Sequence, residues 1–221
     1  MFIGHFGVAL AAKKIAPRTS LGTLVMAAQF VDLIWPIFLL LGVERVIIVP
    51  GATAVTPLDF IRYPISHSLL ADLGWASLFA GIYQIVRRDS RGALCLWFVV
   101  MSHWVLDALT HVPDLPLYPG SWTYVGLGLW NSRAGTFVVE SAIFAVGVIL
   151  YAGATRPRDP TGAIAFRSFA ALLFLLYLAN LLGPPPPSEK AIAYVGLSLW
   201  LFVAWAYWLD RHRRSREREI G

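Results

Sequence analysis

The sequence predicts an all-α membrane protein. Of its 221 residues, 57% are hydrophobic and only 14% are charged, whereas soluble domains carry about 25% charged residues. The mean hydropathy is +0.65, and the apolar residues fall into runs long enough to cross a bilayer as helices. We therefore expect one helical bundle of six transmembrane helices, with a short N-terminal helix that is half-inserted or spanning.

The expected elements follow one another along the chain. Residues 1–16 form a short apolar helix of roughly 24 Å, which is less than a bilayer requires. Six apolar runs then predict full spans, at 20–43, 66–86, 92–112, 134–154, 163–183 and 191–209. Pro184 to Pro187 end the fifth span because proline cannot continue a helix. The connection 44–65 is polar and contains several prolines and glycines, and 113–133 is rich in proline, glycine, tryptophan and tyrosine. We expect both to lie outside the bilayer, over the mouth of the bundle.

We interpret residues 1–221 as a single membrane domain with three parts. The half 1–133 would carry a metal site, the helices 134–209 would support it, and 210–221 would form a solvated basic tail.

Charge predicts the orientation of the bundle. Most of the 18 lysine and arginine residues lie in alternate connections: after the first helix, near 87–91, near 156–167 and in the C-terminal tail. Cytoplasmic loops of membrane proteins carry such an excess. We therefore predict a multi-pass protein of a bacterial-type inner membrane, with the first charged turn and the C-terminal tail in the cytoplasm.

The stretch SHWVLDALTH at 102–111 is the strongest functional signal. His103, Asp107 and His111 recur every four residues, so on a helix they would form a column about 12 Å long on one face. An ionisable group inside a spanning helix costs about 2.5–3.5 kcal/mol on insertion scales. A column of three such groups therefore indicates a function.

Other ionisable groups are expected at the same depth. With the predicted orientation, Asp32 lies roughly 18 Å from the cytoplasmic face, and His67 lies just inside the outer end of its span. His5 lies about 12 Å deep or higher. We expect these groups to meet the column in the outer half of the bundle, beneath the connections 44–65 and 113–133.

Two imidazoles and two carboxylates suit a divalent cation, with Zn²⁺ as the first choice and Mn²⁺ as the alternative. The predicted metal ligands are Asp32, His67, His103 and Asp107. A metal-bound water of lowered pKa would be the nucleophile for hydrolysis of an ester or phosphoester.

Further residues are assigned roles around this site. The predicted catalytic groups are His5 and His111, acting as acid or base or holding a second ion. Ser68 and Ser102 would hydrogen-bond to the neighbouring histidines. Predicted substrate contacts are Asn131, Arg133 and Glu140, with Glu140 alternatively paired to Arg133.

The order of these motifs resembles a known family. His5, Asp32 in QFVDLIWP, SHSLL at 66–70 and SHWVLD at 102–107 resemble the YdjM-type bacterial inner-membrane proteins, described as metal-dependent hydrolases, and are distantly similar to the ligands of zinc-dependent phospholipase C. The resemblance covers roughly 1–133, but the second acid of the family's aspartate element and the leading histidine of its histidine element are absent. It implies one ion shared by the four predicted ligands, with Asp107 bridging to a second ion at His5.

Two other functions fit the same residues. The His/Asp cluster could carry protons in a proton-coupled transporter or relay, or the protein could be a non-enzymatic membrane protein with a structural metal. The expected partners are membrane lipid and a lipid-like substrate. Nucleic acid is not expected, because the positive charge is clustered at the ends of the spans.

Overall fold

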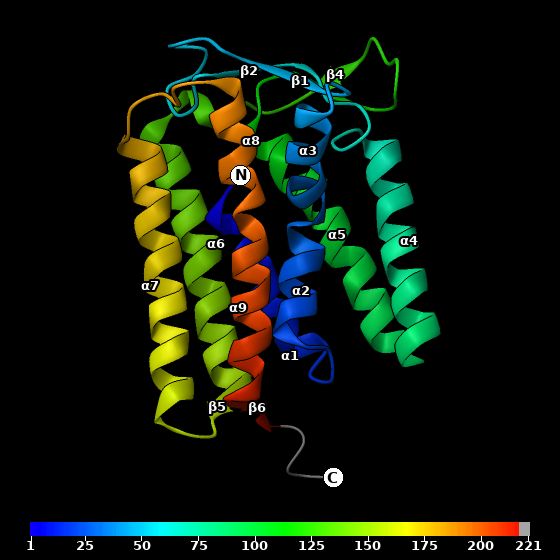
Figure 1. Cartoon of the computed structure of the whole chain (residues 1–221), viewed down its shortest axis with the longest axis vertical. Coiled ribbons are helices and arrows are strands. Elements are labelled where there is room, and N and C mark those ends of the chain that lie inside the picture. The colour runs from blue at the N-terminus through cyan, green and yellow to red at the C-terminus, as the bar shows by residue number, and fades with distance from the viewer. Residues whose placement is uncertain (217–221) are drawn as a thin grey trace.

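The computed structural model describes residues 1–216 and consists mainly of helices (Figure 1). The helices are α1 (Ile3–Ile15), α2 (Leu21–Ala28), α3 (Phe30–Leu40), α4 (Leu69–Arg87), α5 (Ser90–Thr110), α6 (Arg133–Ala154), α7 (Pro160–Leu182), α8 (Glu189–Leu197) and α9 (Leu199–Arg211), with a 3₁₀ turn η1 (Leu129–Asn131). Short strands form three antiparallel pairs: β1 (Arg45–Ile48) with β2 (Leu58–Arg62), β3 (Leu115–Pro116) with β4 (Tyr124–Val125), and β5 (Thr155–Pro157) with β6 (Arg213–Ser215).

The predicted fold class is confirmed. Within residues 1–216, five helices are long and apolar enough to cross a membrane, with Glu189–Arg211 counted as one span, and α2 with α3 makes up to a sixth. The predicted span 20–43 is this pair, which bends by 54° at the break between the two helices.

Serine side chains mark where several helices begin. Ser20, Ser68, Ser132 and Ser188 each accept a hydrogen bond from the backbone N–H three residues further along. Serine at this position satisfies a donor that has no partner inside the helix. Polar residues at the ends of apolar runs therefore fix the starts of α2, α4, α6 and α8.

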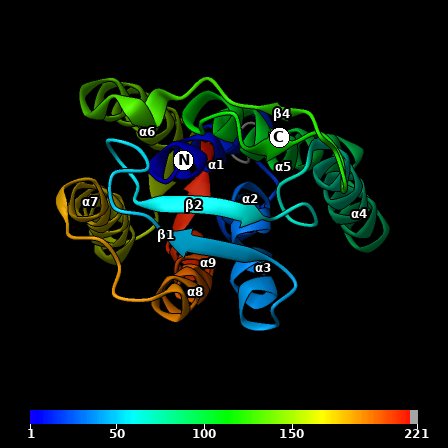
Figure 2. The same cartoon turned by 90° about the horizontal axis from the view of Figure 1, so that it is seen from above.

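Helix α1 lies in the middle of the bundle (Figure 2). Its 13 residues span only about 20 Å, and Ile3, Phe6 and Leu10 are fully buried. Its main neighbour is α6. A Cβ atom on Gly7 would lie 2.7 Å from the Ile143 carbonyl oxygen, so glycine lets the two backbones approach closely.

The connections 44–65 and 113–133 cover one end of the bundle, at the top of Figure 1. The hairpin β1–β2 and the pair β3–β4 lie there, and Val55 N donates to the Trp130 carbonyl across the two connections at 3.1 Å. Trp35, Tyr63 and Leu115 form a small buried core beneath them. We call this the roofed end.

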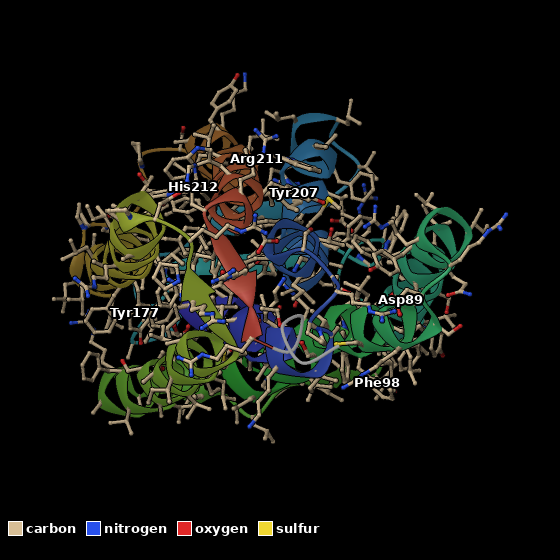
Figure 3. All side chains as sticks on the ribbon, turned by 90° about the horizontal axis from the view of Figure 1, so that it is seen from below. Asp89, Phe98, Tyr177, Tyr207, Arg211 and His212 are labelled. Atoms are coloured by element: carbon tan, nitrogen blue, oxygen red, sulfur yellow. The ribbon has the colours of Figure 1, made fainter. Side chains whose placement is uncertain are left out.

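The opposite end carries the basic connections and is viewed from below in Figure 3. Strand β6 pairs with β5 there. Arg213 is only 6% exposed; its guanidinium bonds the Thr155 hydroxyl at 2.9 Å and lies 4.8 Å from the centre of the Phe166 ring. The prediction of a solvated tail was therefore wrong for β6, because an arginine can pack its planar cation on aromatic rings. Residues 217–221 of that predicted tail lie outside the described residues. We call this the basic end.

Candidate metal centre

Helix α5 presents His103 and Asp107 on one face, as their spacing predicts. Both side chains are buried, and His103 Nε2 lies 3.2 Å from Asp107 Oδ2. The pair lies in the second half of α5, which ends near the roofed end of the bundle (Figure 1).

Asp32 and His67 reach the pair from two other elements. Asp32 lies in the first turn of α3, directly after the bend, and His67 precedes the residue that caps α4. Asp32 Oδ2 lies 3.7 Å from His103 Nε2, and Asp32 Oδ1 lies 3.5 Å from His67 Nε2. His67 Nε2 is also 3.8 Å from Asp107 Oδ2. All four predicted ligands therefore converge.

These separations suit a shared cation better than direct hydrogen bonds. Charge-assisted N–H···O bonds are about 2.7–2.9 Å long. Nitrogen and oxygen ligands placed tetrahedrally at about 2.0–2.1 Å from Zn²⁺ lie about 3.3–3.4 Å from one another. Asp32, His67 and His103 offer ligand atoms within 4.8 Å of one another, and so do His5, His103 and Asp107. The residues therefore fit a divalent ion.

The hydrogen bonds behind the histidines orient the rings for this role. His103 Nδ1 lies 2.8 Å from the carbonyl oxygen of Ala28, the last residue of α2, and a carbonyl can only accept. The proton of His103 therefore belongs on Nδ1, and in the neutral ring Nε2 keeps its lone pair for an ion.

His67 is held by a chain of two further side chains. Its Nδ1 lies 2.6 Å from Ser66 Oγ, which donates to Glu44 Oε2 at 2.6 Å. Glu44 is itself fixed by the backbone N–H groups of Ile65 and Ser66. Because the Ser66 hydroxyl donates its proton to the Glu44 carboxylate, its oxygen accepts a hydrogen bond from His67 Nδ1–H. In the neutral ring, Nε2 of His67 is therefore unprotonated and faces the centre. Neither Ser66 nor Glu44 was predicted from the sequence.

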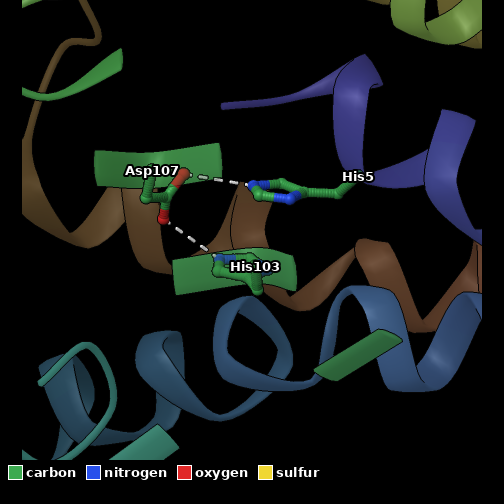
Figure 4. Close-up of side chains that lie close together, drawn as sticks. All are labelled: His5, His103 and Asp107. Atoms are coloured by element: carbon green, nitrogen blue, oxygen red, sulfur yellow. Dashed lines mark hydrogen bonds and ion pairs between the residues drawn. The ribbon is translucent and has the colours of Figure 1, made fainter. Parts of the chain in front are cut away.

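His5 joins the centre from α1 (Figure 4). Its Nε2 lies 3.2 Å from Asp107 Oδ1, the oxygen that His103 does not contact, and its ring stacks on the His103 ring at 3.7 Å with 4° between the planes. The amino group of Met1 lies 2.5 Å from the same Oδ1. Asp107 therefore offers one oxygen to His103 and His67 and the other to His5.

His111 belongs to a neighbouring cluster, not to the predicted column. Helix α5 ends at Thr110, and the backbone of His111 is extended. Its Nδ1 lies 2.9 Å from Asp114 Oδ1, to which Tyr63 also donates at 2.7 Å. Burial lowers the pKa of His111 against the opposing effect of Asp114. Burial and Asp114 together raise the pKa of Tyr63 well above its ordinary value.

The two serines predicted to support the histidines bond elsewhere. Ser68 caps α4 and donates to the Pro64 carbonyl at 2.6 Å. Ser102 donates to the Val99 carbonyl on its own helix at 2.7 Å. The prediction was wrong because both hydroxyls satisfy nearby backbone groups, which serine side chains commonly do.

The three predicted substrate contacts are spread out. Asn131 is exposed in η1, and Arg133 donates to the Ala54 carbonyl at 2.6 Å, which ties α6 to the roof. Glu140 is buried in α6 and accepts from Phe2 N at 2.8 Å. It therefore holds the start of α1, and the alternative that it pairs with Arg133 is not realised.

Comparisons of the chain with protein-family models, curated proteins and solved structures found no match. The resemblance to the YdjM-type family therefore rests on the sequence motifs alone, and the centre is interpreted from its own geometry.

The centre has one partly open side. The side chain of Asp32 is 25% exposed, whereas those of His67 and His103 are 5% and 1% exposed. Asp32 is therefore the most accessible of these three side chains.

Proposed function

We propose that the protein is a membrane-embedded, metal-dependent hydrolase that acts on a lipid-like ester or phosphoester. The observation that carries the proposal is the convergence of Asp32, His67, His103 and Asp107 at separations that suit one shared ion. Burying four such groups is costly unless a charge balances the carboxylates. Zn²⁺ is the first choice for this set, and Mn²⁺ is the alternative.

A divalent ion held there would polarise a substrate oxygen and lower the pKa of a bound water. The substrate would approach from the side of Asp32, which is the most exposed of the four ligands. Across Asp107, His5 would hold a second ion or exchange protons, because its Nε2 lies 3.2 Å from the second carboxylate oxygen. His111 has no part in this proposal, since its Nδ1 is already bonded to Asp114.

A lipid-like substrate is proposed from the surroundings. Helices α3 and α4 present exposed apolar side chains, among them Ile37 and Leu70, as expected of helices that contact acyl chains. The asymmetry of lysine and arginine favours a bacterial-type inner membrane with the basic end in the cytoplasm. The centre would then serve the outer half of the bilayer.

The test is metal content and lipid turnover of the full chain, purified in mild detergent and returned to vesicles. We expect at least one bound divalent ion per chain, measured by elemental mass spectrometry, and release of a labelled group from an ester or phosphoester lipid. Asp107→Asn should lose both. Asp59→Asn, which changes an exposed carboxylate on β2, should lose neither.

The alternatives give different results. A protein that binds no divalent ion but moves protons across vesicles would be a relay, with imidazolium groups balancing the carboxylates. A protein that keeps its ion yet hydrolyses no ester or phosphoester lipid would use the metal structurally. Either result would overturn the hydrolase proposal.

A further inference from the structure

A cavity of about 700 Å³ opens at the basic end, between α2, α4 and α9. Pockets of this size hold small molecules or parts of larger ones. None of the predicted metal ligands lines it. It is therefore a second site, separate from the metal centre.

One part of the cavity wall is strongly positive. The cavity is lined by one carboxylate, Asp210, and by six cationic side chains. The cations are Lys13, Arg18, Arg87, Arg158, Arg213 and Arg214. Asp210 is already engaged, because it accepts a hydrogen bond from Leu21 N and lies 3.5 Å from Lys13 Nζ. The wall therefore carries a net positive charge, which favours an anion as its ligand.

The other part of the wall is apolar and faces sideways. Met26 and Phe30 line it from the bent helix pair, and Phe79, Ile82 and Val86 line it from α4. Ile82 is 54% exposed and Val86 is 70% exposed. Because α4 is a candidate membrane span, this side opens towards the acyl chains of the bilayer.

Hydroxyl-bearing side chains also line the cavity, among them Thr23, Tyr83 and Tyr207. Tyr83 OH lies 3.0 Å from Thr19 Oγ1, and Tyr207 OH lies 2.9 Å from Thr23 Oγ1. Tyrosine favours the interface between headgroups and acyl chains. Cations, hydroxyls and apolar side chains are the groups that the phosphate, ester and acyl parts of a phospholipid require.

We propose that this cavity binds an anionic phospholipid of the surrounding membrane. Its phosphate lies among the cations at the basic end, and its acyl chain lies against α4. The site does not depend on the metal centre, and it belongs to the leaflet at the opposite end of the bundle.

The test uses the full chain in mild detergent, with phosphatidylglycerol, phosphatidylcholine or inorganic phosphate added at equal concentration. Lipid retained in native mass spectrometry and the shift in melting temperature are measured. We expect phosphatidylglycerol to remain bound and to raise the melting temperature, and the other two probes to do neither. A shift with inorganic phosphate equal to that with phosphatidylglycerol would identify a soluble-anion site and overturn the proposal, as would equal retention of phosphatidylcholine.

Matched variants locate the binding. Arg87→Gln should weaken the affinity for phosphatidylglycerol about five-fold, the effect of one cation near a membrane surface. Arg91→Gln should leave it unchanged, because Arg91 is exposed in the first turn of α5, four residues further along the chain, but does not line the cavity. Val86→Glu changes a side chain of the cavity wall and should abolish retention of phosphatidylglycerol. Ile85 is adjacent and 78% exposed but does not line the cavity, so Ile85→Glu should preserve retention. Equal effects within either pair would refute the site.

Discussion

At the scale of single residues, the orientation of His67 depends on a glutamate that is distant in sequence. Ser66 links the imidazole to Glu44 through two contacts of 2.6 Å. Removing the hydroxyl leaves Nδ1 without its acceptor and frees the ring to turn or to change tautomer. If His67 is a metal ligand, we expect Ser66→Ala to weaken metal affinity about 10–100-fold, the usual cost of losing such a partner. Competition with a chromophoric chelator measures the affinity.

The chain offers a control of the same chemistry. Ser102 is also adjacent to a predicted ligand histidine, but its hydroxyl donates only to the Val99 carbonyl. Ser102→Ala should therefore bind metal as the unchanged protein does. Equal loss in both serine variants would mean that the Ser66 contact has no specific role.

The histidines and aspartates that converge in the candidate centre were predictable from the sequence, and the residues that support them were not. Histidine and aspartate stand out within apolar runs because each is costly there. Ser66 and Ser68 both flank His67, and the local sequence makes them look equivalent. The difference is that Ser68 directly precedes an apolar helical run, a position where serine caps the helix and its oxygen is engaged. Glu44 lies in an irregular connection, and its contact with Ser66 is set only by the fold.

At the scale of elements, helix ends decide which residues share a face. The spacing of His103, Asp107 and His111 predicted one column, but α5 ends at Thr110. Pro113 disfavours helical backbone at the residue before it, so the helix stops early and His111 leaves the column. Pro113 is visible in the sequence, but the predicted span 92–112 continued up to it and so ended two residues too late.

The contact between α1 and α6 is the element-scale feature that positions His5. A Cβ on Gly147 would collide with the backbone of Gly7, and backbone cannot move aside cheaply. We expect Gly147→Ala to destabilise the protein by about 1–3 kcal/mol, as overpacking does, and to displace His5 from Asp107. A thermal unfolding series in detergent measures the loss.

Gly153 on the same helix is the matched control. A Cβ there meets nothing within 4 Å, so Gly153→Ala should leave stability unchanged or raise it slightly, since alanine favours helix over glycine. If the two alanine variants unfold at the same temperature, close packing at Gly7 does not hold α1 in place.

At the scale of the whole molecule, the bundle has two chemically different ends. The candidate metal centre lies beneath the roofed end, and the cationic cavity opens at the basic end. The fold class and the bounds of most helices were predictable, because hydropathy and end caps act locally. The bend between α2 and α3 and the pairing of β6 with β5 were not, because both depend on contacts between segments distant in sequence.

Orientation in the membrane decides which leaflet each site serves, and cysteine labelling tests it. Cys95 is buried and is the single cysteine of the chain, so Cys95→Ala gives a clean background. Ala52 is exposed on the roof and Ser90 is exposed at the basic end. The positive-inside rule predicts that the basic end lies in the cytoplasm, so a membrane-impermeant maleimide applied to intact spheroplasts should label Ala52→Cys. Ser90→Cys should react only after the membrane is permeabilised. The reverse pattern would put the metal centre in the cytoplasmic half of the bilayer and would exclude a substrate delivered from the outer leaflet.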